Sequence, residues 1–546
     1  MIAQSCLRKS PGELLAWTLF LVLLSSMLPG TVDSEERIVP PASHGAKART
    51  TAMEISPEIG PIVDPTQEGP LQITVRDAVF MALGNNRSLV VERLNPQIQK
   101  TFEDQERAVF DPTVEAEVSS ERDQSERLAR SGSATEAYIS DIYKGSIALK
   151  EFFPTGTFVE ADVATTTTDS SLYSAPFTST RLGISLTQSL LRGFGTETNL
   201  VRLRKAKLDT RISQYELRGF SESLVTQVEN AYWDYALSQR QIEIMEESLK
   251  LANQQLTETE EMIQVGTMAE AELAAVQAEV AAQQQGLINA KSALESSRLQ
   301  LLRLLNPPGP GLWDRNVTLV HPPRLPEIEL DEVDSHVLFA LRMRPEMNQA
   351  RLDIQQEDLE VVRTRNGLLP RMDLFVTLGK TGYAESFSGS VSNIGGDSHD
   401  VTVGLNVEYP LLNRDARAQN RRALFQRDQS EKALENLTQL VELDVRTAYI
   451  EVNRTKEQIS ASTATRKFQE EKLRIETEKF RVGRSTNLFV AQAQRDLLVS
   501  RINEVQAVVN YLKALIDFYR LEGSLLERRG IEAPGRDAVD YSSKNH

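Results

Sequence analysis

Residues 401–412 read VTVGLNVEYPLL, and in this stretch a β-strand pattern gives way to a helical one. Apolar residues alternate with small or polar ones from Val401 to Tyr409, which is the period of two expected of a strand with one apolar face. No proline occurs between Pro410 and Pro534. Because proline is costly inside a helix, this long gap predicts an uninterrupted helical region directly after the strand.

The same alternation occurs in three other segments, at residues 113–119, 181–190 and 373–380. Over roughly eight to ten residues it suits a membrane-barrel strand, although a half-buried strand of a soluble sandwich alternates in the same way. Residues 142–168 show an extra hairpin pattern around Pro154-Thr155-Gly156. Two strands per half cannot close a barrel, so we expect several chains to share one.

The chain is an internal duplication. At one constant offset Val228, Ala231 and Tyr232 recur as Val445, Ala448 and Tyr449, and Val265-Gly266 recurs as Val482-Gly483. Both halves run in the order short helical segment, strands, very long helical region, which indicates two copies of one structural unit. We assign the repeats to residues 71–306 and 331–523, with a linker at residues 307–330 and a polar tail at residues 524–546.

The long helical regions carry an apolar residue at every seventh position. The series is Val228, Tyr235, Ile242, Leu249, Leu256 and Ile263 in the first half, and Val445, Val452, Ile459, Leu473 and Phe480 in the second, with Arg466 interrupting it. This repeat predicts coiled-coil packing. A helix of about 68 residues would be roughly 100 Å long, which argues against the alternative of an ordinary compact bundle.

Gly266 and Gly483 occupy matching positions inside these regions, and we expect each to fold its half into a helical hairpin. A glycine after a helix can adopt the left-handed conformation that ends it. The hydroxyl residues that follow, Thr267 and the pair Ser485-Thr486, can cap the next helix.

The N-terminus indicates secretion. Residues 1–34 combine Arg8 and Lys9 with a short apolar run and predict a signal peptide, a membrane anchor being the alternative. We expect residues 35–70 to form a flexible leader. No later apolar run reaches about 18 residues, so a membrane location would require a β-barrel.

Composition excludes several classes of function. The net charge of −16 argues against nucleic acid as a partner. The single cysteine, Cys6, excludes disulfides within the chain, and the five histidines lack the spacing of metal ligands. No nucleophilic arrangement or phosphate-binding loop is present, so we expect neither an enzyme nor a cofactor.

Taken together, these features resemble the TolC-like outer-membrane factor family over about residues 70–525. The resemblance rests on the duplication, the run LTQSLLRGFG at residues 186–195, the run YPLL at residues 409–412 and the paired Val-Gly turns. It implies an α+β membrane protein, a homotrimer whose shared β-barrel in the outer membrane continues as a long α-helical coiled-coil barrel across the periplasm.

The resemblance also implies a function. The chain would be the passive exit duct of a tripartite efflux or type I secretion system, surrounded by outer-membrane lipid. It would be coupled to an inner-membrane transporter through a periplasmic adaptor (membrane fusion) protein. The alternative function is a periplasmic or secreted coiled-coil protein that acts in structure or interaction.

Two sets of residues at the hairpin turns are candidate sites. The adaptor-docking tips are Val265, Gly266, Thr267, Val482, Gly483, Arg484, Ser485 and Thr486. The gate residues are Glu272, Arg484, Phe489 and Gln492, because the acidic positions of the family's closed end fall on Phe489 and Gln492 in this chain. We expect a Glu272–Arg484 ion pair with Phe489 as an apolar constriction; the alternative is that both charges are merely solvated.

Overall fold

The computed structural model describes residues 70–128, 132, 135–171, 174–320 and 328–540 of the chain, all within one compact unit, Val63–His546. The predicted signal peptide at residues 1–34 lies outside the described residues, as do residues 35–69 of the leader and Cys6.

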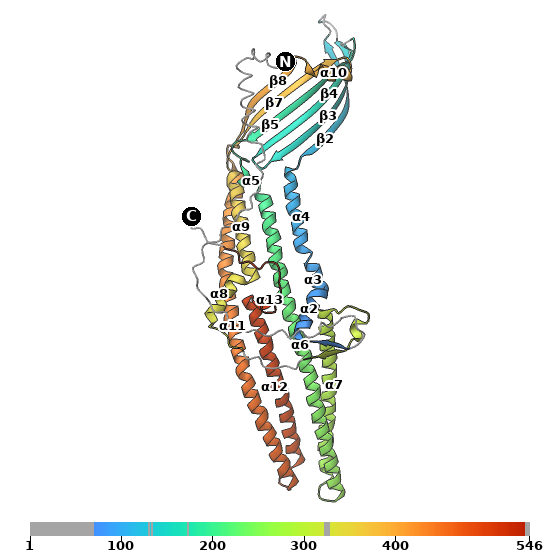
Figure 1. Cartoon of the computed structure of the whole chain (residues 1–546), viewed down its shortest axis with the longest axis vertical. Helices are drawn as coiled ribbons and strands as arrows, with labels where there is room; N and C mark the ends of the chain where they lie inside the picture. Colours follow the sequence, from blue (N-terminus) through green and yellow to red (C-terminus); the bar gives the residue numbers. More distant parts are fainter. Residues whose placement is uncertain (1–69, 129–131, 133–134, 172–173, 321–327, 541–546) are drawn as a thin grey trace, which may run out of the picture. The chain divides into compact units, whose positions relative to one another are not determined.

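Six strands form one antiparallel sheet, seen side by side in Figure 1. They are β2 (Thr113–Leu128), β3 (Thr135–Phe153), β4 (Thr157–Ser170), β5 (Phe177–Ser189), β7 (Arg371–Ala384) and β8 (His399–Glu408), and they pair in this order. The strands β2 and β8 form the two edges. The predicted alternating segments lie in these strands to within one residue at their ends, so the strand prediction is confirmed, although most strands are longer than the pattern indicated.

The first half contributes four strands to the sheet and the second half two. The expected hairpin at residues 142–168 is confirmed as β3 and β4, which pair from Ser140–Ser170 to Phe153–Thr157. The extra hairpin therefore adds two strands to the basic plan of two strands per half. Gly156 turns this hairpin with a φ of 88°, and a Cβ there would lie 2.2 Å from the carbonyl oxygen of Gly193. Glycine is required at this position both by its φ and by the close approach.

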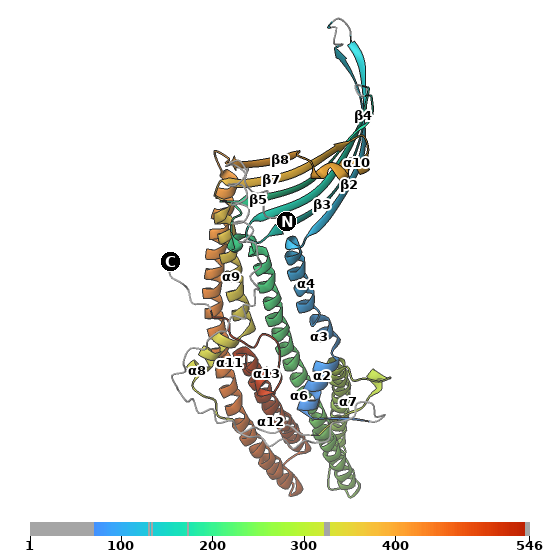
Figure 2. The same cartoon turned by 45° about the horizontal axis from the view of Figure 1, so that its top comes forward.

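The first two strands extend beyond the rest of the sheet. β2 and β3 pair as far as Leu128–Thr135, whereas the pairing of β3 with β4 stops at Ser140. Figure 2 shows this two-stranded ribbon projecting past its neighbours. Towards their other ends the strands connect to helices, so the sheet continues directly into the helical part.

The helices account for most of the described chain. Those of the first half are α2 (Val75–Asn85), α3 (Arg87–Glu92), α4 (Asn95–Arg107), α5 (Thr196–Asn199), α6 (Val201–Gln264) and α7 (Ala271–Leu305). Those of the second half are α8 (Val333–Met343), α9 (Pro345–Asn366), α10 (Phe387–Ser392), α11 (Arg414–Arg481), α12 (Asn487–Glu522) and α13 (Leu525–Arg528). Short 3₁₀ turns lie at Ala108–Phe110 (η1), Leu312–Asp314 (η2) and Asn393–Gly395 (η3).

The helices α6 and α11 have 64 and 68 residues. At 1.5 Å per residue each is about 100 Å long, as the sequence predicts. The helix α6 packs along α7, and α11 packs along α12, so each half does contain a helical hairpin.

The residues of the seven-residue repeat lie on the packed side of the helices, but they are not equally buried along the helix. Val228, Val445 and Val452 are fully buried. Towards the hairpin turns the best-buried residues of α6 are small ones, Ala252 and Thr259, while the large apolar residues of the repeat are half-buried. Small side chains let neighbouring helices approach closely, and this need overrides the simple apolar pattern.

Arg466, which interrupts the repeat, is accommodated by ion pairs. Its guanidinium lies 2.6 Å from a carboxylate oxygen of Glu504 on α12 and 2.8 Å from one of Glu470 on α11. The interruption is thus a polar link between the two helices of one hairpin.

The main hydrophobic core lies part-way along the long helices, where α2, α6, α7, α8, α11, α12 and α13 meet. Its most buried members include Tyr232, Leu301, Leu305 and Phe518. A small parallel sheet of β1 (Leu71–Ile73) and β6 (Val317–Leu319) packs into it. The C-terminal segment takes part as well, because Leu525 and Leu526 are fully buried.

Candidate functional site: helix tips, charged junction and sheet faces

The two hairpin turns have the same backbone geometry. Gly266 and Gly483 have φ values of 75° and 71°. The N–H of the following residue bonds to the carbonyl five residues earlier, from Thr267 to Met262 and from Arg484 to Lys479. With the glycine N–H bonded three residues back, each turn is a Schellman motif. The predicted left-handed helix end is confirmed at both positions.

The predicted capping of the next helix is wrong in its detail. Thr486 is the N-cap residue of α12, but its side chain makes no capping hydrogen bond. Ser485 instead donates to Glu476 of α11 at 2.9 Å, and the Thr267 hydroxyl donates to the Met262 carbonyl at 2.9 Å. The hydroxyls therefore hold the ends of the preceding helices.

The tip side chains are mostly open to solvent. Val265 and Val482 are among the exposed apolar residues, and Phe489, Gln492 and Arg484 are exposed as well. Glu272, in the first turn of α7, is partly buried. Within the described part of the chain no ion pair joins Glu272 to Arg484. The proposed latch therefore stays a prediction about contacts with neighbouring chains.

The structure reveals a link between the two hairpins that the sequence analysis missed. Asn487, the first residue of α12, is only 2% exposed. Its amide accepts a hydrogen bond from Gln255 of α6 at 3.0 Å and donates to the sulfur of Met268 at 3.4 Å. An asparagine at a helix start reads as an ordinary capping residue, so nothing in the pattern indicated this contact.

A second link between the hairpins is ionic. Arg501 of α12 lies 3.1 Å from Glu247 of α6 and 3.5 Å from Glu470 of α11. Closer to the tips, Arg495 of α12 lies 3.7 Å from the buried Glu279 of α7. Polar contacts therefore connect the second hairpin to the first along the half of the helices nearest the turns.

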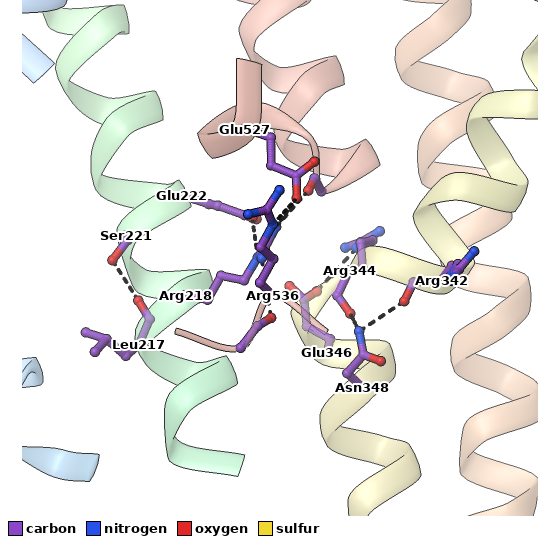
Figure 3. Close-up of polar contacts among 12 residues, drawn as sticks. Leu217, Arg218, Ser221, Glu222, Arg342, Arg344, Glu346, Asn348, Glu527 and Arg536 are labelled. Atoms are coloured by element: carbon purple, nitrogen blue, oxygen red, sulfur yellow. Dashed lines mark hydrogen bonds and ion pairs between the residues drawn. The ribbon is translucent and has the colours of Figure 1, made fainter. Parts of the chain in front are cut away.

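A charged junction anchors the C-terminal segment to α6 (Figure 3). Arg218 is fully buried, with its Nε 3.2 Å from Glu222 and its terminal nitrogen 3.9 Å from Glu527. It also donates to the carbonyl oxygens of Gly523 and Gly535. Burial raises the pKa of Glu222 to about 7, although the nearby Arg218 charge opposes this.

The junction extends to α9. Asn348 donates to the carbonyls of Arg342 and Arg344 (Figure 3), and it accepts a hydrogen bond from the N–H of Val539 at 2.8 Å. Arg344 in turn lies 3.1 Å from Asp444 of α11. Helices from both halves and the C-terminal segment are thus locked together at this level.

The two faces of the sheet differ in chemistry. One face is apolar and exposed over several strands; its residues include Val114, Val118, Ile147, Leu149, Val163, Leu182, Ile184, Val403, Leu405 and Val407. The opposite face carries charged and hydroxyl side chains. The alternation predicted from the sequence therefore corresponds to one apolar and one polar surface.

Arg181 crosses the polar face. Its guanidinium lies 3.5 Å from Asp162 of β4 and 2.9 Å from Asp400 of β8. The room for it comes from Gly183 and Gly379, where an added Cβ would lie 2.3 Å and 2.6 Å from its terminal nitrogens. The glycines on the polar side of these strands thus accommodate an ion-pair bridge that spans four successive strands, from β4 across β5 and β7 to β8.

Across the described ranges, no helix is both long enough and apolar enough to span a membrane. In the same part of the chain no three His, Cys, Asp or Glu side chains gather as metal ligands would.

Comparison with known proteins identifies the family. The profile described as outer membrane efflux protein matches residues 79–307 and 339–524, which is most of the chain. The chain belongs to the outer membrane efflux protein family. This confirms the resemblance drawn from the sequence and rules against the alternative of a periplasmic or secreted coiled-coil protein that acts in structure or interaction. No curated protein sequence matches the chain.

Solved structures show the same fold at low identity. The outer-membrane channel OprN is 18% identical with a TM-score of 0.62, and the match covers 82% of this chain and 90% of that one. The CmeC channel of Campylobacter jejuni is 16% identical with a TM-score of 0.61, covering 83% and 86%. The open-state MtrE channel of Neisseria gonorrhoeae is 17% identical with a TM-score of 0.60, covering 83% and 89%.

As a member of this family the chain is an exit duct of the outer membrane. Its strands and helices have the same fold as these solved channels. Its candidate functional features are the two sheet faces, the hairpin turns and the polar contacts between helices.

Proposed function

We propose that three copies of the chain assemble into one continuous duct, with the sheets closing a barrel in the outer membrane. The observation that carries this proposal is the pair of sheet edges. Among the described strands, β2 pairs only with β3 and β8 only with β7. A backbone edge exposed to lipid would leave its polar groups unsatisfied, so β8 of one chain must pair with β2 of the next.

Three chains of six strands give eighteen strands, an even number within the range of bacterial barrels. The apolar face would then contact lipid and the polar face, with Arg181 and its partners, would line the lumen. A barrel of this size leaves an aqueous channel rather than a side-chain-filled core.

Exposed apolar stripes on the helices support the same assembly. Val91, Leu94, Ile98 and Phe102 recur at helical spacing along α3 and α4, and all are exposed in the single chain. The helix α11 exposes Phe425, Leu443 and Ile450. Contact between α4 of one chain and α11 of the next would bury both stripes and continue the ring of strands as a ring of helices.

We further propose that the helix tips dock a periplasmic adaptor protein, which connects the duct to an inner-membrane transporter. The Schellman turns at Gly266 and Gly483 present exposed valines at equivalent positions, so one type of partner surface fits both. In the resting state the contacts of Asn487 and Arg501 hold the second hairpin against the first. Docking would compete with these contacts and move the tips apart.

Disulfide trapping tests the assembly. The variants are made in a Cys6→Ala background. A single cysteine on the polar face of β2 is combined with Asn406→Cys on β8, and it replaces Glu115, Glu117, Ser119 or Glu121. Oxidation should yield covalent dimers and trimers for at least one pair. Ser146→Cys on the interior strand β3, combined with Asn406→Cys, is the control and should yield none. Light scattering that shows a monomer in detergent would overturn the proposal.

A further inference from the structure

A cavity of about 710 Å³ lies where the sheet passes into the helices. It is formed by the β5–α5 connection, the C-terminal end of α9, and the segment that leads from β8 into α11. Arg192, Arg363 and Arg414 line it, one from each of these three segments, and Asp415 is the one acidic residue of the lining.

The charge of the cavity is unbalanced. Arg363 is neutralised by Glu360 at 2.6 Å, whereas Asp415 keeps its negative charge because its hydrogen-bond donor, Gln419, is neutral. Two arginines against one aspartate leave the lining positive. In the described part of the chain, Arg192 and Arg414 form no ion pair. Two guanidinium groups thus remain available to an anion, and guanidinium is the side-chain group best suited to bind phosphate bidentately.

The wall of the cavity leads onto apolar surface. Leu411 and Leu412 line it and are 91% and 62% exposed. They continue from Val407 and Leu405, which are exposed on the apolar face of β8. Between these features Asn413 is buried and donates to the Leu368 carbonyl at 3.1 Å, which ties this segment to the turn after α9. A phosphate group and a hydrocarbon chain would therefore both find complementary surface within a short distance.

We propose that this cavity binds the phosphate group of a membrane phospholipid, whose acyl chains lie on Leu411, Leu412 and the apolar face of β8. The proposal rests on the proposed function, since that function places the apolar face in the membrane. The cavity would then lie at the periplasmic boundary of the bilayer, where basic pockets attract lipid headgroups. Bound lipid would fix the depth of the sheet in the membrane.

Native mass spectrometry of the detergent-purified assembly tests the site by titration with phosphatidylglycerol. Arg192→Gln combined with Arg414→Gln should weaken retention of the lipid, by about fivefold for each arginine removed. Arg454→Gln combined with Arg474→Gln changes the charge of the assembly equally, from exposed positions further along α11, and should leave retention unchanged. If the double variant fails to assemble, the two single variants carry the test.

Two further arms separate lipid from free phosphate. Diacylglycerol with the same acyl chains lacks the phosphate and should be retained weakly by wild type and variant alike. Inorganic phosphate that competes fully with the lipid would show an anion site without a role for the acyl chains. Equal retention of phosphatidylglycerol by wild type and the double variant would overturn the proposal, as would a trimer structure with side chains of the neighbouring chain filling the cavity. The mass of the assembly and its conductance in planar bilayers are measured on the same preparation. They test the proposed duct independently of lipid binding.

Discussion

The side chains of Gln255 and Asn487 are joined by a 3.0 Å hydrogen bond from Nε2 to Oδ1, which ties the turn end of one hairpin's first arm to the first residue of the other hairpin's second arm. Asn487 is buried and Gln255 is half-buried, so this bond is partly shielded from competing water. It fixes the tip of the second hairpin relative to the first, which is where a change in the width of the duct would have to begin.

The first prediction concerns this bond. Asn487→Ala should raise the resting open probability of purified channels in planar bilayers about fivefold, because a buried hydrogen bond contributes about 1 kcal/mol. Asn510→Ala is the matched control on the same helix, since the Asn510 amide oxygen accepts from Gln506 of α12 itself. An unchanged open probability for Asn487→Ala would show that the tips are held by other contacts.

The second prediction separates this link from a latch between chains. If Glu272 and Arg484 pair across neighbouring chains, Glu272→Gln and Arg484→Ala should each increase resting conductance modestly, since an exposed pair contributes roughly 0–1 kcal/mol. The double variant should equal either single variant. If Phe489→Ala alone opens the channel while both charge variants behave as wild type, the seal is apolar and the ionic latch is wrong.

The third prediction concerns the tip turns. Gly483 has a φ of 71°, and a Cβ there would meet no other atom within 4 Å. Any effect of substitution therefore comes from backbone strain, which is severe for a β-branched residue and mild for asparagine. Gly483→Val should abolish efflux in cells while trimers still insert, and Gly483→Asn should retain it. Equal efflux by the two variants would argue against a docking role for this turn.

The fourth prediction concerns ion selectivity. Acidic residues outnumber basic ones on the polar face of the sheet. The acidic residues on this face include Glu115, Glu117, Glu160, Asp162, Asp373, Asp400 and Glu408, and the basic residues include Lys144, Lys150, Arg181 and Arg371. We expect the wild-type channel to prefer cations. Asp162→Asn combined with Asp400→Asn should shift the reversal potential in a KCl gradient towards zero. Glu258→Gln, at an exposed position on α6, provides a control with a lost carboxylate away from the sheet. Anion preference in the wild type would contradict the assignment of this face to the lumen.

The fifth prediction concerns pH. Burial raises the pKa of Glu222 from 4.5 to about 7, so the folded protein binds a proton there that the unfolded chain releases. Its contribution to stability is therefore fully present below about pH 4.5 and is lost as the pH rises to about 7. The difference corresponds to roughly 3 kcal/mol. Glu222→Gln should flatten the dependence of the unfolding temperature on pH in this window, measured by circular dichroism at a fixed scan rate. Glu258→Gln should leave the wild-type profile unchanged.

Local patterns were sufficient for much of the fold. The alternation at residues 401–409, the absence of proline between Pro410 and Pro534, and the matched Val-Gly turns predicted the strands, the long helices and the hairpins. These features are properties of short segments, because strand faces, helix continuity and left-handed turns depend on neighbouring residues alone. The family followed from their order along the chain.

Tertiary structure decided which distant residues meet. The contact between Gln255 and Asn487, the bridge of Arg181 to Asp162 and Asp400, and the docking of Val539 against Asn348 each join segments from different parts of the chain. Such contacts depend on the relative placement of helices and strands, which a periodic sequence pattern does not specify. The sequence by itself determined the elements and their order; only their packing placed single polar side chains together, because a hydrogen bond or ion pair is set by distances of a few ångströms.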